Sequence, residues 1–240
     1  MEWRDEGVLL SLRPHGESSA IIEVFCKDHG RHYGLVRGGK TRRMMPILQI
    51  GAQLSLHWRA KTEEQLGQFF VEPLKSRAGA LEDPLALAGL SSVCAMLHVS
   101  LAERLPHPQF YDRSIALLDA QAQGDSAWIA DYLRWEMAML DEIGFGLDLA
   151  RCAVTGSRED LAYVSPRTGR AVSRAGAGEW ASRLLPLPQV LLGQGPASGP
   201  EALQALAVTG HFLARELAAH HGVITLPEAR QRLLSRLMRL

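Results

Sequence analysis

Seven basic side chains fall between His29 and Lys61, a stretch that contains no Asp or Glu. Because like charges repel, such a run is unfavourable unless a polyanion, a membrane surface or distant acids offset it. Phosphates suit it best, since the run has a strand-like pattern with Gly38 and Gly39 at its centre, as a groove facing a nucleic-acid backbone requires. A solvated loop is the alternative. We therefore predict as phosphate contacts Arg31, Arg37, Lys40, Arg42, Arg43, Arg59 and Lys61.

The rest of the chain shows that this charge is local. The 26 Lys and Arg residues balance the 26 Asp and Glu residues, and 47% hydrophobic content over 240 residues is enough for one large or two ordinary domains with a packed core. No apolar run is long enough to cross a bilayer and the amino terminus lacks a signal-peptide pattern, so a cytoplasmic protein is expected. Cys26, Cys94 and Cys152 are far apart, which suggests free thiols and provides no CxxC metal pair.

Candidate catalytic groups do not converge in the sequence. Ser91, Ser92 and His98 share a predicted helix, but a nucleophile needs an orienting group and an oxyanion site as well. The glycines between Gly34 and Gly39 lack the GxxxxGK[ST] order of a phosphate-binding loop. We therefore expect neither an enzyme nor a cofactor.

The basic run must be positioned by strands, because the first eighty residues alternate between apolar and polar with period two. Short strands are predicted at 8–12, 20–26, 33–36, 54–58 and 68–71. Five strands in so short a segment predict a small closed barrel over residues 1–80. The five-stranded Greek-key barrel, the OB-fold, presents a concave face to single strands or oligosaccharides, and the charge favours nucleic acid.

After Asp83 and Pro84, an N-cap and a first-turn proline, the period changes to 3.6. Residues 81–240 are therefore predicted to form a mainly helical domain, which gives an α+β protein. Leu90, Cys94 and Leu97 begin the first apolar stripe. Further helices are expected over 108–123, over 126–143, over 200–221 with Ser198 as cap, and over 227–240 as a short basic helix with Arg230, Arg232, Arg236 and Arg239.

An ordered set of residues resembles the RecO family of bacterial DNA repair proteins. In the barrel it comprises Trp3, Asp5-Glu6-Gly7, His15-Gly16-Glu17, Ala20, Glu23, His29-Gly30-Arg31, Val36-Arg37-Gly38-Gly39, Gln49 and Gly51. In the helical part it comprises His107-Pro108, Leu117-Leu118, the run from Gly144 to Leu149, and Cys152. The resemblance covers most of the chain and agrees with the barrel-then-helices order predicted from periodicity.

The resemblance implies a recombination mediator without a catalytic centre. Such a protein binds single- and double-stranded DNA, anneals complementary strands and acts with RecR to load RecA where single-strand-binding protein coats a gap, so it would be found with the nucleoid. The helical domain would bind the acidic, hydrophobic tail of single-strand-binding protein, which needs an apolar groove with a cation at its rim. Candidate cations on predicted helices are Arg104, Arg113, Arg134 and Arg215, although each could be an ordinary solvated side chain.

Many members of the family carry a zinc finger with two CxxC pairs, and this chain departs from that pattern. The corresponding positions are Cys152, Thr155, Ser173 and Gly176, so only one thiol remains. One thiolate cannot hold structural zinc, and we predict a metal-free, zinc-finger-like remnant over about 150–178, with a hairpin tip at 165–169. Substitute ligands could be sought among His211, His220 and His221, but histidines at a helix end more often face solvent.

Two other classes of function remain open. In an interaction scaffold, the barrel would dock a protein partner and the basic residues would bind an acidic tail. In an RNA-binding barrel, exposed aromatic side chains would stack unpaired bases. Only Tyr33, Trp58, Phe69 and Phe70 are near the basic run, and alternation predicts that some of them fill the barrel, so phosphate contact should outweigh stacking.

Overall fold

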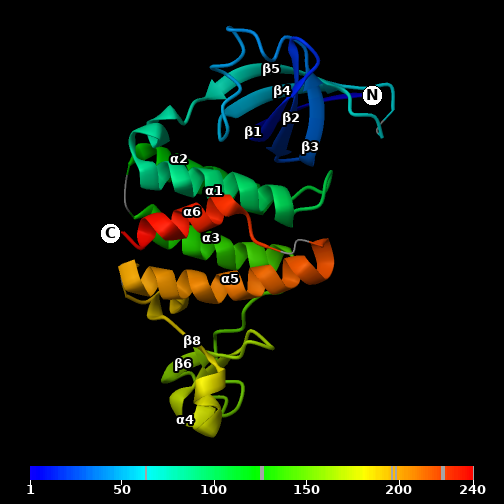
Figure 1. Cartoon of the computed structure of the whole chain (residues 1–240). Coiled ribbons are helices and arrows are strands. Elements are labelled where there is room, and N and C mark those ends of the chain that lie inside the picture. The colour runs from blue at the N-terminus through cyan, green and yellow to red at the C-terminus, as the bar shows by residue number, and fades with distance from the viewer. Residues whose placement is uncertain (63, 125–126, 196, 198, 223–224, 240) are drawn as a thin grey trace. The chain divides into compact units, whose positions relative to one another are not determined.

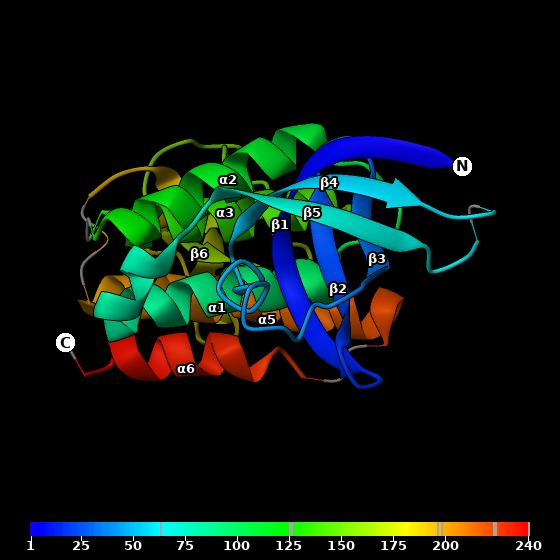
Figure 2. The same ribbon diagram turned by 90° about the horizontal axis from the view of Figure 1, so that it is seen from above.

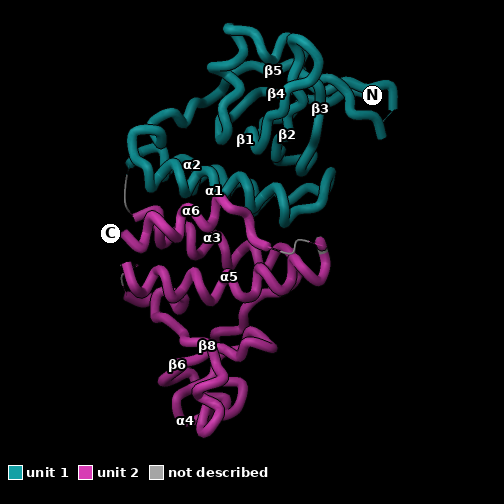
Figure 3. Tube along the Cα trace, in the orientation of Figure 1, with its two compact units in different colours: residues 1–124 teal, residues 125–240 magenta. Residues whose placement is uncertain are grey.

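The computed structural model describes residues 1–62, 64–124, 127–195, 197, 199–222 and 225–239. The chain divides into two compact units, Met1–Gly124 and Asp125–Leu240, which are coloured separately in Figure 3. The first unit holds five strands and two long helices, whereas the sequence suggested a boundary near residue 80. The helices that follow the strands belong to the first unit because they pack against the strands.

The strands predicted at the amino terminus are confirmed, with longer bounds (Figure 1). They are β1 (Glu2–His15), β2 (Ser19–Cys26), β3 (Gly30–Val36), β4 (Gln53–Arg59) and β5 (Gln68–Lys75). They close into a barrel in the order β1-β2-β3-β5-β4. Neighbours are antiparallel except β3 and β5, which run parallel and pair at one position, Leu35 with Gln68.

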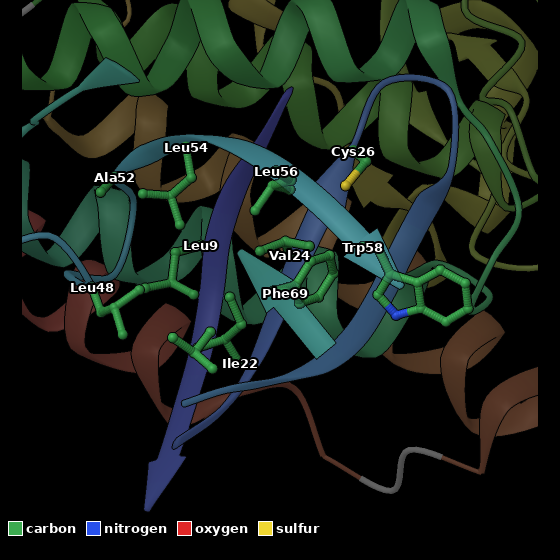
Figure 4. Packing of buried hydrophobic residues seen from close by; sticks show 11 residues of the cluster. Leu9, Ile22, Val24, Cys26, Leu48, Ala52, Leu54, Leu56, Trp58 and Phe69 are labelled. Atoms are coloured by element: carbon green, nitrogen blue, oxygen red, sulfur yellow. The ribbon is translucent and has the colours of Figure 1, made fainter. Parts of the chain in front are cut away.

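Side chains that alternate along the strands fill the barrel, as Figure 4 shows. In β3 and β4, buried residues alternate with more exposed ones, as expected for strands with one apolar face. Trp58 and Phe69 are each 1% exposed. A side chain at Gly34 would begin 2.3 Å from the Phe69 ring, so the close packing of this ring requires glycine there.

Two helices complete the first unit: α1 (Pro84–Ser100), which follows the 3-10 turn η1 (Ala78–Glu82), and α2 (Pro108–Gln123). The Asp83 side chain caps α1 by accepting a hydrogen bond from the Leu85 backbone N–H at 2.8 Å. Gly124 ends α2 with a left-handed φ of 77°. The predicted stripe of α1 is buried, and α1 packs against β1 (Figure 2), where the Cys94 thiol lies 4.0 Å from the Leu9 carbonyl oxygen.

The second unit is built on helices α3 (Trp128–Glu142), α5 (Gly199–His221) and α6 (Glu228–Leu237). Its smaller elements are β6 (Leu161–Val164), β7 (Ala171–Ser173), α4 (Arg174–Ala177), η2 (Gly178–Arg183), β8 (Leu185–Pro186) and η3 (Gln189–Leu192). α3 packs against α5, and both bury aromatic and leucine side chains. The predicted first residue of the third helix, Ser126, and the predicted cap, Ser198, lie outside the described residues.

The short basic helix predicted at the carboxy terminus is present as α6, and one of its arginines is buried. Arg230 is 2% exposed, and its Nε and Nη2 lie 2.7 and 2.9 Å from the two carboxylate oxygens of Glu136. Arg230 also donates to the Leu206 carbonyl at 2.7 Å. Arg232 and Arg236 of the same helix are exposed. In the described part of the chain, the helices are too short or too polar to span a membrane.

Candidate nucleic-acid interface

The outer face of β1, β4 and β5 places polar and aromatic side chains in rows across the strands. Arg4 pairs with His57, which pairs with Phe70. In the next row Glu2 pairs with Arg59, which pairs with Gln68. Residues two apart on a strand share a face, so these two rows lie side by side on the barrel surface.

A groove of about 740 Å³ lies over this face. Its cationic side chains are Arg4, on β1, and Arg37, which follows β3 directly. His57 and Phe70 line the same groove, and Glu72 contributes one acid. Arg37 was predicted from the basic run, whereas Arg4 was missed because it lies outside that run. Arg4 could have been identified from the pairing of β1 with β4, which sets Arg4 opposite His57.

A second groove, of about 600 Å³, contains the far end of the basic run. Arg59 and Lys61 line it. It shares Gln68 and Phe70 with the first groove, so the two form one continuous surface. Arg59 Nε lies 2.7 Å from the Glu2 carboxylate, and its positive charge lowers the pKa of Glu2.

One aromatic ring remains available on this surface. Phe70 is 49% exposed, while Trp58 and Phe69 fill the barrel, as strand alternation predicted. The Arg59 guanidinium lies 5.8 Å from the centre of the Phe70 ring. An exposed ring beside a cation can stack one base while the cation contacts phosphate.

The loop after β3 carries the other predicted contacts. Lys40, Arg42 and Arg43 are all exposed. The loop turns at Gly38, whose φ of 68° is left-handed, and the Thr41 hydroxyl donates to the Gly38 carbonyl at 2.7 Å. The structure therefore displays these three cations on a hydrogen-bonded turn next to Arg37.

Arg31 differs from the other six predicted contacts, because it is engaged inside the first unit. Its side chain is 12% exposed and forms an ion pair with Glu23, which is fully buried. Its Nε donates to the Leu101 carbonyl at 2.9 Å, and His98 Nδ1 lies 2.7 Å from Glu23. Burial raises the pKa of Glu23, but hydrogen bonds and charges from His98 and Arg31 outweigh burial and hold it below its usual value.

The four predicted partner-binding cations lie on four segments, two in each unit. The prediction that Arg104 lies on a helix is wrong. α1 ends at Ser100, and Arg104 lies in the following loop with a left-handed φ of 62°. Arg113 is exposed on α2. Arg134 pairs with Asp131 at 2.6 Å.

Arg215 is the most engaged of the four. Its guanidinium donates to the carbonyls of Pro166 and Arg167 at 2.5 and 3.1 Å. It also lies 4.4 Å from the Phe145 ring centre and 5.1 Å from that of Phe212. This arginine therefore holds the β6–β7 hairpin tip against α5.

The four positions that the resemblance assigned to zinc ligands lie around one sulfur atom. Cys152 is 1% exposed, and its Sγ accepts hydrogen bonds from the Ser173 N–H at 3.2 Å and hydroxyl at 3.3 Å, and from the Thr155 N–H at 3.4 Å. A side chain at Gly176 would begin 2.9 Å from this sulfur. Burial raises the pKa of Cys152, but the bonds from Ser173 and Thr155 prevail and lower it to about 6.

This donor set does not fit zinc, because three of the four positions provide no thiolate or imidazole. Hydrogen bonds occupy the sulfur instead. The predicted hairpin tip is confirmed: Ser165 and Gly169 close the turn between β6 and β7. His211 lies 3.3 Å from the Pro166 carbonyl oxygen, and His220 lies 3.5 Å from Glu216. Among the residues that the structure describes, no three His, Cys, Asp or Glu side chains are grouped to hold a metal.

A barrel with exposed cations and an aromatic ring along a continuous groove, joined to a helical unit, defines a class of α+β proteins suited to binding nucleic acid. Comparison with known proteins gives the family. The family model "Recombination protein O N terminal" matches residues 1–77, and "Recombination protein O C terminal" matches residues 81–222. The chain belongs to the RecO family, as its residues predicted.

Curated relatives with the same family name match this chain over nearly its full length. A protein named DNA repair protein RecO from Cereibacter sphaeroides is 64% identical over 239 residues, which cover 100% of this chain and 99% of the relative. A protein of the same name from Dinoroseobacter shibae is 57% identical, with 100% and 99% covered. Another, from Roseobacter denitrificans, is 55% identical, with 97% and 96% covered.

Proposed function

We propose that this chain is a non-catalytic DNA-binding mediator that anneals complementary strands and helps to load RecA onto single-stranded DNA. Membership of the RecO family supports a role in DNA repair and recombination. The observation that carries the finer proposal is the surface that the two grooves share, with Arg37 lining the first groove and Lys61 lining the second. We interpret the barrel as an OB-fold, whose outer face binds the strand.

The chemistry of this surface suits annealing. Arg4, Arg37, Arg59 and Lys61 can neutralise phosphates without reading sequence, because backbone contacts carry no base information. Phe70 offers a single stacking surface, so most bases of a bound strand remain free to pair. We assign the contact with a second backbone to Lys40, Arg42 and Arg43, which are exposed on the loop after β3.

The proposal includes no bond-making step, no cofactor and no metal. We interpret the segment around Cys152 as a zinc-finger-like insert that folds through hydrogen bonds to its sulfur rather than through zinc. Elemental analysis of the purified protein is expected to find no stoichiometric zinc. A melting temperature that falls when a chelator is added would contradict this part.

The proposed partners are RecR, RecA acting indirectly, and single-strand-binding protein, whose acidic tail would bind a helical surface. Among the four candidate cations, Arg113 is the one we place at the rim of that site. It is exposed on α2, and the other three are engaged within the chain: Arg104 with Glu103, Arg134 with Asp131, and Arg215 with the hairpin tip. A fluorescent tail peptide should bind the full chain and bind Arg113→Glu more weakly. Equal binding would refute the assignment.

The main test is titration of labelled single-stranded DNA at several salt concentrations. Arg4→Gln with Arg37→Gln should lower the salt slope by about one unit for each phosphate that is no longer neutralised. Arg42→Glu with Arg43→Glu should weaken binding strongly at low salt. The matched control is Arg151→Gln, which removes an exposed arginine of the second unit and should change neither quantity.

Three results would contradict the proposal. Folded groove variants that bind as tightly as the parent would remove the groove from the interface. Absence of binding at low salt would favour a protein-interaction scaffold. Tighter binding to RNA of the same sequence would favour an RNA-binding barrel.

A further inference from the structure

The second unit presents one tryptophan at its surface. Trp180, in η2, is 62% exposed, whereas Trp58, Trp128 and Trp135 are no more than 2% exposed. The Arg183 guanidinium lies 4.8 Å from the centre of the Trp180 ring, which is close enough for a cation–π contact. Because most of the Trp180 side chain remains accessible, this contact orients the ring without covering it. An oriented, accessible indole can stack an unpaired base, since every base has a flat face.

A small polar pocket lies in the same unit, around the segment that contains β6 and α4 (Figure 1). It holds about 220 Å³. Its polar lining comes from Arg158 and Asp160 before β6, from Arg174 at the start of α4, and from Gln189 and Gln194 in and after η3. Pockets for whole small molecules usually begin at about 300 Å³. This pocket therefore suits a single ionic group, and its two arginines against one acid favour an anion.

The two arginines of this pocket can reach an incoming anion. Arg158 is exposed. Arg174 Nε lies 3.5 Å from the Asp160 carboxylate, and both side chains are more than half exposed. Exposed ion pairs of this kind contribute little to stability, so Asp160 does not prevent Arg174 from binding another anion. Guanidinium groups bind phosphate oxygens through charge-assisted hydrogen bonds, and the two glutamine amides can donate to the same group. The anion that fits these donors best is a phosphate.

The walls of the pocket are held by backbone hydrogen bonds. The Arg174 N–H donates to the Asp160 carbonyl at 3.0 Å, which fixes the start of α4 against the segment before β6. The Leu187 N–H donates to the Ala162 carbonyl at 2.9 Å, which fixes the segment after β8 against β6. A pocket whose walls are already in place loses less conformational freedom when it binds a ligand.

Consecutive elements join the pocket to the exposed tryptophan. α4 begins at Arg174, η2 follows it directly and contains Trp180, and the two elements contact each other. Arg174 and Trp180 are six residues apart, so their Cα atoms are separated by at most about 22 Å. The chain from Leu161 to Gly178 contains no Asp or Glu. A flexible polyanion with flat rings, which describes a single strand of nucleic acid, can therefore reach both places.

We propose that the second unit makes its own contact with single-stranded nucleic acid, with a backbone phosphate between Arg158 and Arg174 and an unpaired base stacked on Trp180. The inference deepens the proposed function and rests on it, because it adds a contact in the second unit to the grooves of the first. Annealing requires that two strands be held at once, and contacts on separate units provide for this. The second contact selects no sequence, because it uses a phosphate and the flat face of a base.

The stacking contact can be tested by fluorescence of the full-length protein. Binding of a single-stranded oligothymidylate should protect Trp180 from quenching by acrylamide, and the difference between the parent and Trp180→Phe isolates this signal. Trp180→Ala should weaken binding about tenfold, as expected for the loss of one stacked base, whereas Trp180→Phe should keep most of the affinity. A parent protein whose tryptophan quenching does not change when DNA binds would refute the contact without any variant.

The phosphate contact can be tested by the salt dependence of the same titration. Arg158→Gln with Arg174→Gln should lower the salt slope by about one unit, because one phosphate is no longer neutralised. The matched control is Arg151→Gln, an exposed arginine that does not line the pocket, and it should leave the slope unchanged. Inorganic phosphate, added at constant ionic strength, should compete only weakly with the oligonucleotide. Phosphate that raises the melting temperature of the parent but not of the double variant, together with equal DNA binding by both, would make the pocket a site for free phosphate and overturn the inference.

Other failures have different meanings. Variants of the second unit that are folded and bind DNA with the affinity and salt slope of the parent, while the groove variants are impaired, would overturn this inference and leave the proposed function intact. Protection of Trp180 by an acidic peptide but not by DNA would make the surface a protein-docking site. No binding of any oligonucleotide would overturn both proposals.

Discussion

Each unit of the molecule contains a fully buried glutamate that is paired with an arginine, and the two sites are built differently. In the second unit, Glu136 binds Arg230 through both carboxylate oxygens and accepts a hydrogen bond from Thr209, and all three side chains are buried. In the first unit, Glu23 binds Arg31 and His98, and the His98 side chain is 47% exposed. One ion pair is sealed from water, whereas the other reaches the surface through a histidine.

The difference shows what decides the role of a cation. Arg31 lies in the acid-free run and Arg230 in a basic tail, yet each neutralises a carboxylate that would otherwise be buried without a partner. Charge density along the sequence therefore overstates how many cations are free for phosphate. The following predictions test whether the sealed site is more sensitive than the open one.

The largest effect is expected from Arg230→Met. It leaves the carboxylate of Glu136 buried without its cation, and breaking a buried pair in this way costs about 3–5 kcal/mol. Urea unfolding of the full chain should show the loss. Arg232→Met, an exposed position on the same helix, is the control and should change stability by less than about 0.5 kcal/mol. The double variant Glu136→Leu/Arg230→Met should recover most of the loss, and failure to recover would mean that packing rather than charge is responsible.

A smaller loss is expected from Arg31→Met, about 1–3 kcal/mol, because the carboxylate of Glu23 keeps other hydrogen bonds. Those bonds come from His98 at 2.7 Å and from the Ser11 hydroxyl at 3.0 Å. The salt slope of DNA binding should not change, whereas Arg37→Met should lower it. A lower slope for Arg31→Met with unchanged stability would reverse the comparison and return Arg31 to the phosphate contacts.

The smallest expected effect is on the stability of the chain at acidic pH. The pKa of Glu23 is held below its usual value in the folded chain, so its ionised form adds stability above the unfolded pKa of about 4.3. This stability should be lost as pH falls from that value through the lower folded pKa. The free energy of unfolding, measured from pH 6 down to pH 3 for the parent and Glu23→Gln, should show a steeper decline for the parent. Parallel curves would mean that Glu23 does not titrate in this range.

Local signals predicted most of the fold. Alternation located all five strands, and the Asp83 cap and the proline after it fixed the start of α1. Gly124 marked the end of α2. These features depend on neighbouring residues, which a single sequence shows directly.

The site was only partly predictable, because its pairings join distant segments. Glu23 pairs across the hairpin with Tyr33, which places Arg31 on its diagonal, so hairpin register could have revealed that ion pair. His98 lies on α1, 75 residues after Glu23 in the sequence, and no local pattern predicts its contact with Glu23. The grouping of α1 and α2 with the barrel depends on packing in the same way.

The way the barrel closes affects the surface formed by the two grooves. β3 and β5 pair at one position, Leu35 with Gln68, and the Leu35 N–H donates to the Gly67 carbonyl at 3.0 Å. This seam has the fewest paired positions of the barrel's pairings, and local opening of a sheet begins where its bonds are fewest. Gln68 lines both grooves, so a DNA strand bound along the proposed path would cross this seam. Binding of DNA there would then stabilise the closed barrel, and local opening between β3 and β5 would weaken DNA binding.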